Sequence, residues 1–257
     1  MSAKEIYIAF QTILVKEILR FVRIWIQTLL PPAITTALYF VIFGSLIGSQ
    51  IGDMEGFAYM DFIVPGLILM AVITNSYANV VSSFYSSKFQ HNIEEMLISP
   101  TPNYVILLGH VAGGVARGLF VGFIVTGVSL FFTDLSIDNW FITTLVILLT
   151  AFLFSLAGFI NAVYANSFDD ITIIPTFVLT PLTYLGGVFY SIKMLPDFWQ
   201  DVSLANPILY MVNAFRYGIL GASDIAIGTA FGLIIGFIIL LFGWAMYLLN
   251  NGIGIRK

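Results

Sequence analysis

Six apolar stretches, each long enough to cross a lipid bilayer as a helix, constrain this chain more than any other feature of its sequence. A membrane-spanning helix needs about 20 mostly apolar residues in succession. Only 9% of the 257 residues are charged, against about 25% in soluble domains. We therefore expect an all-α integral membrane protein with six transmembrane helices, over residues 28–50, 61–84, 104–132, 140–164, 171–190 and 227–249.

The placement of lysine and arginine predicts the orientation of these spans, because positive charge favours the cytoplasmic side. With the N-terminus inside, basic residues dominate the cytoplasmic side and acidic residues the other, and an even number of spans returns the C-terminus inside. The cytoplasmic set is Lys4, Lys16, Arg20, Arg23, Lys88, Arg256 and Lys257; the opposite set is Asp53, Glu55, Asp61, Asp134, Asp138, Asp197, Asp201 and Asp224, with Lys193 and Arg216.

Residues 4–27, ahead of the first span, have the pattern of an amphipathic helix. Lys16, Arg20 and Arg23 recur at helical spacing, and an apolar face repeats beside them. Such a helix is suited to lying along an anionic membrane surface. We expect an interface helix whose functional residues are Lys16, Glu17, Arg20 and Arg23; the alternative is an ordinary first helix packed against protein.

The segment from Ser87 to Pro100 is a short charged stretch between two spans, and it predicts a helix that a soluble partner could grip. Ser86 and Ser87 have the residue type of a helix start, and prolines at 100 and 102 end the segment. We expect one apolar face and one polar face, with Glu94 and Glu95 setting the register of docking; the alternative is a merely solvated face. The candidate contact residues are Lys88, Phe89, His91, Ile93, Glu94, Glu95 and Leu97.

Polar residues within the second and third spans are candidates for a translocation path. Polar groups in hydrocarbon need partners, and a charge there is costly. Asn75, Tyr77 and Asn79 therefore either line a path or hydrogen-bond across helices. Arg117 either makes a substrate or gating contact or is a structural arginine bonded to backbone carbonyls or to amides such as Asn75, Asn79 or Asn161. Around Arg117, glycines recur at four-residue spacing, which favours close helix packing within one subunit over a dimer seam.

Two prolines, Pro175 and Pro181, interrupt the fifth span. Each removes a backbone donor, so the freed carbonyl groups need other partners. Thr176, Thr180, Thr183 and Tyr184 could supply them or face a substrate, so the segment is either a kinked packed helix or part of a conduit wall. Residues 191–226 follow. This segment is too apolar for a simple loop, its apolar runs are too short to cross, and it predicts re-entrant helices at the outer face.

The sequence contains no constellation that supports catalysis. Cysteine is absent, and the two histidines match no metal-binding motif. No G-x-x-x-x-G-K-[ST] segment is present, so the chain itself is not expected to bind ATP. We expect a protein that is not an enzyme and holds no cofactor or metal.

The chain resembles the permease subunits of type-2 (ABC-2) ABC exporters over its whole length. The resemblance rests on KEILRFVRIWIQTLLPPAITTALYFVIFGSLIG, IEEMLISPTP, PTFVLTPLTYLGGVFYSIKMLP and NPILYMVNAFRYG. It implies one transmembrane domain over 1–257 in a bacterial inner membrane. It further implies a homodimer around a conduit and two copies of a separate ATPase that binds ATP and Mg²⁺.

By the same resemblance, residues 87–100 are a coupling helix and residues 191–226 a re-entrant segment. The implied substrate is amphipathic, lipid-linked, glycan or drug-like, and no nucleic-acid partner is expected. A passive channel or membrane scaffold without a motor is the alternative.

Overall fold

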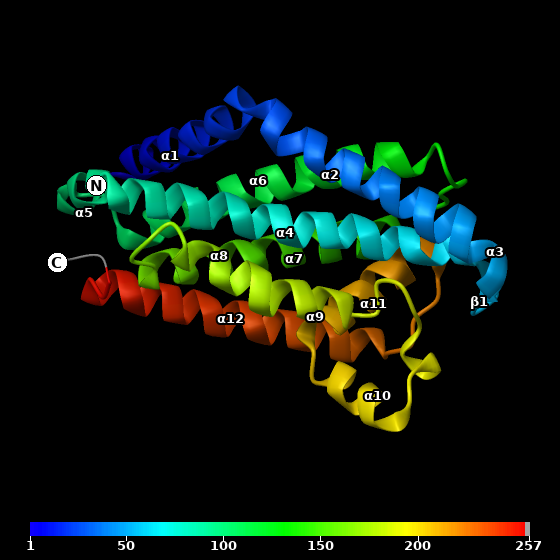
Figure 1. The fold of residues 1–257 in the computed structure, drawn as a ribbon. Helices are drawn as coiled ribbons and strands as arrows, with labels where there is room; N and C mark the ends of the chain where they lie inside the picture. The colour runs from blue at the N-terminus through cyan, green and yellow to red at the C-terminus, as the bar shows by residue number, and fades with distance from the viewer. Residues whose placement is uncertain (255–257) are drawn as a thin grey trace.

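The computed structural model describes residues 1–254, apart from the side chains of residues 45–47, 49 and 97. Arg256 and Lys257, which the charge pattern assigns to the cytoplasm, lie outside the described residues. The described chain is helical apart from its loops and one small hairpin (Figure 1). Its longer helices are α1 (Ala3–Arg23), α2 (Trp25–Tyr39), α4 (Tyr59–Phe89), α6 (Asn103–Ser129), α7 (Trp140–Tyr164), α11 (Pro207–Leu220) and α12 (Ile227–Asn251); its shorter elements are η1 (Phe40–Ile47), α3 (Gly48–Ile51), β1 (Asp53–Met54), β2 (Phe57–Ala58), α5 (Asn92–Ile98), α8 (Asp170–Ile174), η2 (Pro175–Leu179), α9 (Thr180–Tyr184), η3 (Ile192–Met194) and α10 (Asp197–Leu204).

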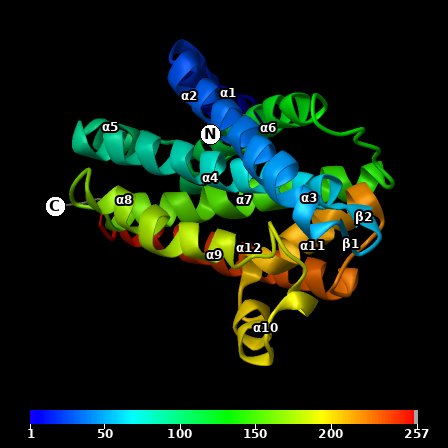
Figure 2. The same ribbon diagram turned by 45° about the vertical axis from the view of Figure 1, so that its right-hand side comes forward.

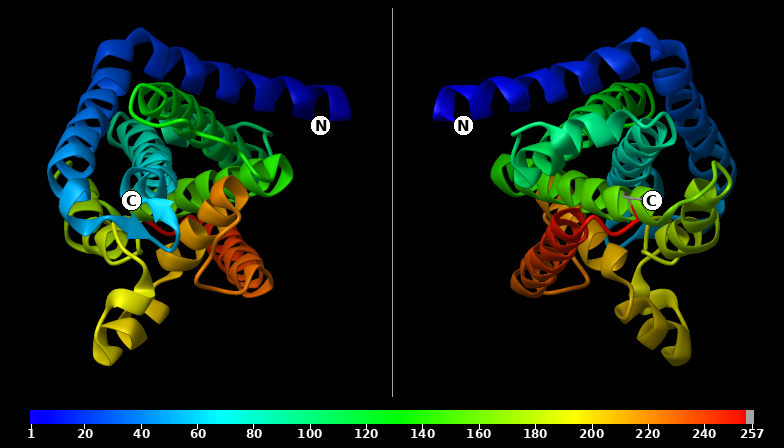
Figure 3. Two further views of the ribbon diagram at one scale, coloured as in Figure 1. Left: turned by 90° about the vertical axis from the view of Figure 1, so that its right-hand side faces the viewer. Right: turned by 90° about the vertical axis from the view of Figure 1, so that its left-hand side faces the viewer.

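The long helices form one elongated bundle with two distinct ends. The N-terminus, α5 and the last turn of α12 gather at one end, which we call the α5 end (Figure 1). The antiparallel β1–β2 hairpin and α3 lie at the other, which we call the hairpin end (Figure 2). Seen along the bundle, α1 lies across the other helices, and α2 descends obliquely along one side of them (Figure 3).

Among the described residues, five helices are long and apolar enough to cross a membrane. They are Trp25–Gly44, Tyr59–Phe89, Asn103–Ser129, Trp140–Tyr164 and Ile227–Asn251. This agrees with an all-α membrane protein, and each coincides with one predicted span. The first begins at Trp25 rather than at residue 28, so Pro31 and Pro32 lie inside α2 instead of at its start.

The predicted fifth span, 171–190, is helical only from Asp170 to Tyr184 and is therefore shorter than the other five. Its middle is the π-helical turn η2, where the backbone N–H of Thr180 reaches the carbonyl oxygen of Pro175, five residues earlier. The Thr180 hydroxyl donates to the same oxygen at 2.9 Å. The Pro175 carbonyl already has this backbone donor, whereas the carbonyls that Pro175 and Pro181 leave without a helical donor are those of Ile171 and Phe177. The Ile171 oxygen accepts a hydrogen bond from the Asn161 amide at 3.4 Å, so the predicted role of the threonines as partners of the freed carbonyls stays a prediction. Membrane crossing by this segment stays a prediction.

Helix α4 is the central element, and most of its residues are buried. The glycines of α6 explain how neighbouring helices approach it and one another. A Cβ on Gly114 or Gly118 would overlap side chains of α4, whereas one on Gly109 would lie 2.6 Å from Ile13 of α1. The glycine repeat therefore serves packing within the subunit on two faces of α6, as the spacing favoured.

Residues 191–226 form two short helices at the hairpin end. The first, α10, projects away from the bundle (Figure 1) and exposes Phe198 and Trp199. The second, α11, is mostly buried against the bundle and is too short to cross a bilayer. The segment has the helix lengths predicted for re-entrant helices, and its depth in a membrane stays a prediction.

Candidate functional site

The coupling segment at the α5 end differs from the predicted helix in where it begins. Helix α4 continues through Phe89, and α5 starts at Asn92. Between them His91 adopts a left-handed backbone conformation with φ 61°. A left-handed residue cannot continue a right-handed helix, so His91, and not the serines at 86 and 87, sets the start of α5. The predicted start was wrong for that reason.

The side chains of this segment divide between the protein interior and solvent. Ile93 is fully buried, whereas Glu94, Glu95 and Ile98 are exposed. His91 Nδ1 lies 2.9 Å from Glu94 Oε1 in an exposed pair. Phe89, one of the candidate contact residues, belongs to α4. The side chain of Leu97 is outside the described residues.

Lys88 points inward, although it was predicted as a partner contact. Its ammonium nitrogen donates to the carbonyl oxygens of Val163 and Ala165, both at 2.7 Å. These oxygens lie at the C-terminal end of α7, where a cation is favoured by the helix dipole. A cavity of about 260 Å³ opens beside Lys88, between α4 and the residues that follow α7.

An aromatic cluster beside Lys88 connects the end of α4 to the loop before α8. The ring of Phe168 lies 5.2 Å from that of Phe89 and 4.9 Å from that of Tyr85. Two residues later Asp170 accepts backbone hydrogen bonds from Asn166 and Ser167, which hold the pKa of its carboxyl group below its ordinary value. The end of α4 is thus tied to the beginning of the proline-interrupted helix.

The predicted interface helix α1 does not present all of its charged residues to the surroundings. Lys16 and Arg23 are exposed, but Glu17 is fully buried. Arg20 donates two hydrogen bonds of 2.8 Å to Asn79 of α4, one to its carbonyl and one to its amide oxygen. For Glu17 and Arg20, the structure therefore matches the alternative of a helix packed against protein.

A cavity of about 290 Å³ lies between α2, α4 and α6 and contains part of the predicted path. Arg117 and Asn75 line it and are joined by a 3.3 Å hydrogen bond. Because Pro31 and Pro32 have no N–H, the carbonyls of Gln27 and Thr28 lose their usual helical donors. These residues line the same cavity, which gives its wall a polar character.

Four other path candidates stand near a second, smaller cavity. Thr180, Thr183 and Tyr184 line a space of about 50 Å³ with Thr74 of α4, and Thr176 is exposed on the same helical run. The hydroxyl of Tyr184 lies 2.6 Å from that of Tyr39 on α2. This contact joins the walls of the two cavities.

The structure places two path candidates elsewhere. Tyr77 is buried and its backbone packs on Gly158 of α7. Asn79 is fully buried and holds Arg20. Sequence reasoning also missed residues that the structure brings to these cavities, Tyr39 and Gln27 among them, because an isolated polar residue near a helix end carries no signal of its neighbours.

At the hairpin end, four polar residues join three separate loops. Lys193 Nζ lies 2.9 Å from Glu55 Oε1 and 3.1 Å from Asp224 Oδ1. The hydroxyl of Ser191 donates to the same two carboxylates at 3.0 Å. We call Glu55, Ser191, Lys193 and Asp224 the outer clamp. Hydrogen bonds to Glu55 and Asp224 raise the pKa of Lys193 above its ordinary value.

Arg216 fixes the buried helix α11 to the bundle. Its guanidinium lies 3.8 Å from the centre of the Phe62 ring, and Nη2 donates to the carbonyl oxygen of Gly187 at 2.6 Å. The side chain is almost fully buried. The charge pattern assigned Arg216 to the outer surface, whereas its contacts make it a packing residue.

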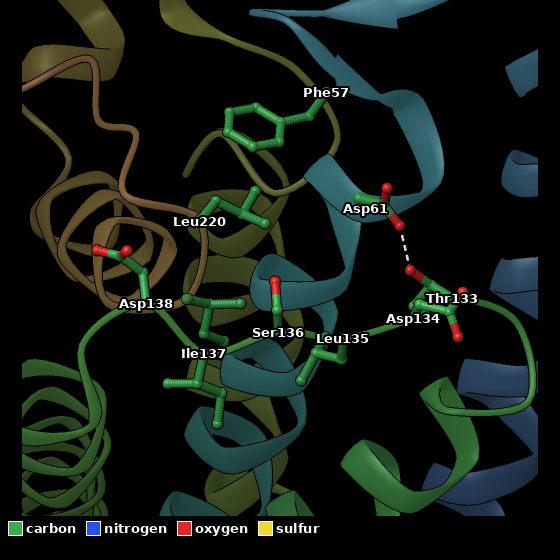
Figure 4. Close-up of a pocket in the computed structure, with 10 residues that line it drawn as sticks. Phe57, Asp61, Thr133, Asp134, Leu135, Ser136, Ile137, Asp138 and Leu220 are labelled. Atoms are coloured by element: carbon green, nitrogen blue, oxygen red, sulfur yellow. Dashed lines mark hydrogen bonds between the residues drawn. The ribbon is translucent and has the colours of Figure 1, made fainter.

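A further cavity, of about 400 Å³, lies at the hairpin end (Figure 4). Asp61, Asp134 and Asp138 line it, and the hydroxyl of Thr133 donates to Asp61. Across the described residues, no group of three or more histidine or acidic side chains is arranged to hold a metal ion.

Comparison with known proteins places this geometry in a family. The model of the ABC-2 type transporter family matches residues 8–220. The chain is 58% identical over 251 residues to the inner membrane transport permease YadH of Escherichia coli K12, covering 98% of each chain, and it matches YadH of Shigella flexneri equally. It is 24% identical over 194 residues to nodulation protein J of Rhizobium meliloti, covering 74% of this chain and 72% of that one.

The family model covers the helices that line the cavities of about 290 and 50 Å³, together with α5 and the outer clamp up to Lys193. These matches confirm the resemblance drawn from the sequence. The chain belongs to the ABC-2 type transporter family and is a multi-pass inner membrane transport permease.

Proposed function

We propose that this chain is the membrane subunit of an ATP-driven exporter and that a separate ATPase docks on α5. The observation that carries the proposal is the form of α5. It is set off from α4 by the left-handed His91, and it exposes 85% of the apolar Ile98 beside two exposed carboxylates. An apolar side chain with flanking charges is suited to a protein partner, since the apolar contact provides affinity and the charges set the register.

In this proposal the ATPase acts from the cytoplasm, and both termini lie on that side with α5. Two permease copies pair around a conduit, and two ATPase copies bind below them. The ATP and Mg²⁺ belong to the ATPase. Family membership supports the ATPase partner, and the basic residues near α1 and α5 support the orientation.

The proposed path uses the cavity between α2, α4 and α6. Arg117 contributes a positive charge to a wall of mixed polar and apolar residues, and the threonines of α2 contribute hydroxyl groups. A charge within the bundle is favoured only beside a partner or a wet cavity; Arg117 has a partner in Asn75 and lines the cavity. The wall suits an amphipathic substrate with an anionic or polar head, such as a lipid-linked or glycan molecule.

Co-purification tests the proposal. The permease is purified with the ATPase encoded nearest to it, as the wild type and as Glu94→Lys/Glu95→Lys. The expected result is a complex with measurable ATP hydrolysis for the wild type and at least a tenfold loss of bound ATPase for the double variant. Asp197→Lys/Asp201→Lys, an equal charge change on exposed α10, is the matched control and retains the ATPase.

Two outcomes contradict the proposal. A wild type that holds no ATPase points to a passive channel or a scaffold. Full retention of the ATPase by the α5 variant places the docking surface elsewhere, with α1 as the next candidate.

A further inference from the structure

A buried polar cluster joins α1 to α4, the helix that precedes α5 in the chain. Glu17 is fully buried, and its Oε1 accepts a hydrogen bond from the Ser83 hydroxyl of α4 at 2.6 Å. The same oxygen lies 3.4 Å from Nδ1 of the fully buried His110 of α6. Arg20 reaches Asn79 and lies 3.4 Å from the other Glu17 oxygen. We call Glu17, Arg20, Asn79, Ser83 and His110 the α1 joint.

The glycines of α6 bring this cluster together. A Cβ on Gly113 would overlap the side chain of Glu17, so glycine is required for α1 to approach closely enough for the carboxylate to enter the bundle. Burying a carboxylate is costly unless it is paired and hydrogen-bonded. A surface helix could keep its acidic residue in water, so the burial of Glu17 calls for an explanation beyond the amphipathic pattern.

The position of the α1 joint along α4 offers an explanation for the burial of Glu17. Ser83 lies six residues before Phe89, the last residue of α4, which corresponds to about 9 Å of continuous helix. A displacement that α5 passes to the end of α4 therefore reaches Ser83 through continuous helix, since Ser83 and Phe89 belong to one helix and only the break at His91 lies between that helix and α5. On the other side of the joint, α1 ends at Arg23, and Ile24 is not helical (φ −110°, ψ 36°). Helix α2 follows and lines the cavity of about 290 Å³.

We propose that Glu17 is a positioning residue through which α4 moves α1, so that motion at α5 is passed to the cavity wall formed by α2. The inference rests on the proposed function, since it assigns a route to the motion that the ATPase supplies. It differs from direct action of the ATPase on α1, which would need no buried contact between α1 and α4.

Hydrogen–deuterium exchange on the intact permease–ATPase complex tests this route, because it reads α1 and α5 separately. Exchange in residues 3–23 and 92–98 is compared without nucleotide and with ATP plus vanadate. The variants are Glu17→Ala, which removes the carboxylate, and Ser83→Ala, which removes one hydrogen bond and changes the packing little. Gln11→Ala, at an exposed position of α1, is the matched control.

The expected result is a nucleotide-dependent change in both segments of the wild type and the control. In Glu17→Ala and Ser83→Ala, the change in residues 92–98 persists and the change in residues 3–23 falls to less than half. An unchanged response of residues 3–23 in Ser83→Ala and in Glu17→Ala overturns the inference, as does a wild-type α1 that gives no response. Failure of the wild type to co-purify with an ATPase is seen before any exchange is measured, and it overturns the proposed function itself.

Discussion

The ammonium nitrogen of Lys88 donates a 2.7 Å hydrogen bond to the carbonyl oxygen of Val163, which joins the last turn of α4 to the end of α7. A second bond of the same length goes to Ala165. A lysine near a helix C-terminus satisfies carbonyl groups that have no donor within the helix. The residue that charge counting assigned to a partner contact is therefore a brace between two helices.

Replacing Lys88 by methionine tests this brace. The variant keeps an apolar side chain of similar length but leaves the carbonyl groups of Val163 and Ala165 without their donor. We expect a loss of about 1–3 kcal/mol in unfolding free energy, measured by thermal unfolding of the purified permease. Lys4→Met, at an exposed position, is the control and changes stability little. Equal stability of the two variants would show that the brace contributes nothing.

Gly113→Ala tests the close approach of α1 to α6. The added methyl group would overlap Glu17, so α1 must move outward. We expect a destabilisation of about 1–3 kcal/mol, typical of overpacking. Gly127→Ala on the same helix has open space around it and provides the control, with a gain of up to about 1 kcal/mol from the higher helix propensity of alanine. A stable Gly113→Ala variant would contradict the packing described above.

The glycine spacing and the apolar runs show how far the sequence could predict this fold. Apolar length determines where helices can cross, and small residues at four-residue intervals determine where helices can touch, so both were predictable. The partner of each glycine face was not, since Gly113 faces α1 and Gly114 faces α4 only because of how the bundle is assembled. Residues in contact across the bundle are far apart in the chain.

Local signals failed where tertiary contacts outweighed them. The serines at 86 and 87 have the residue type of a helix start, yet α4 runs through them because Lys88 and Phe89 pack against the end of α7 and the loop that follows it. The amphipathic pattern predicts that Glu17 is exposed to solvent. The structure buries it, and only the absence of a side chain at Gly113 allows this burial. Arg117 illustrates a partial success, since its need for a partner was predictable and Asn75 was among the partners considered.

The contact between Tyr39 and Tyr184 predicts coupled effects on transport. Their hydroxyls lie 2.6 Å apart and join α2 to α9. In a double-mutant cycle of Tyr39→Phe and Tyr184→Phe, each single variant removes the shared hydrogen bond, so the double variant adds little. We expect a coupling energy of about 0.5–1.5 kcal/mol, measured from substrate-stimulated ATP hydrolysis by the complex. Additive effects would show that the two hydroxyls act independently in the working protein.

The outer clamp predicts a particular dependence of stability on pH. Burial pushes the pKa of Asp224 upward, but contacts with Glu55, Lys193 and Ser191 outweigh it and hold the pKa below the ordinary 3.8. A carboxyl group with a lowered pKa stabilises the fold above its ordinary value and loses this effect as the pH falls through the lower, folded value. Lys193 has a pKa above the ordinary 10.5, so its contribution is complete below 10.5 and is lost at still higher pH.

Both charges are therefore present throughout the neutral range, and the clamp is independent of pH there. We expect Lys193→Met to lower the unfolding free energy by at most about 1 kcal/mol, because the lysine is largely exposed and solvent screens the pair. The difference from the wild type should be constant from about pH 5 to about pH 9 and disappear in stronger acid, as Asp224 becomes protonated. Thermal unfolding across this pH range measures the difference in stability between Lys193→Met and the wild type. Lys193→Arg is the charge-preserving control. A difference that changes near pH 6 to 7 would contradict this account, because the lowered pKa of Asp224 and the raised pKa of Lys193 both lie outside that range.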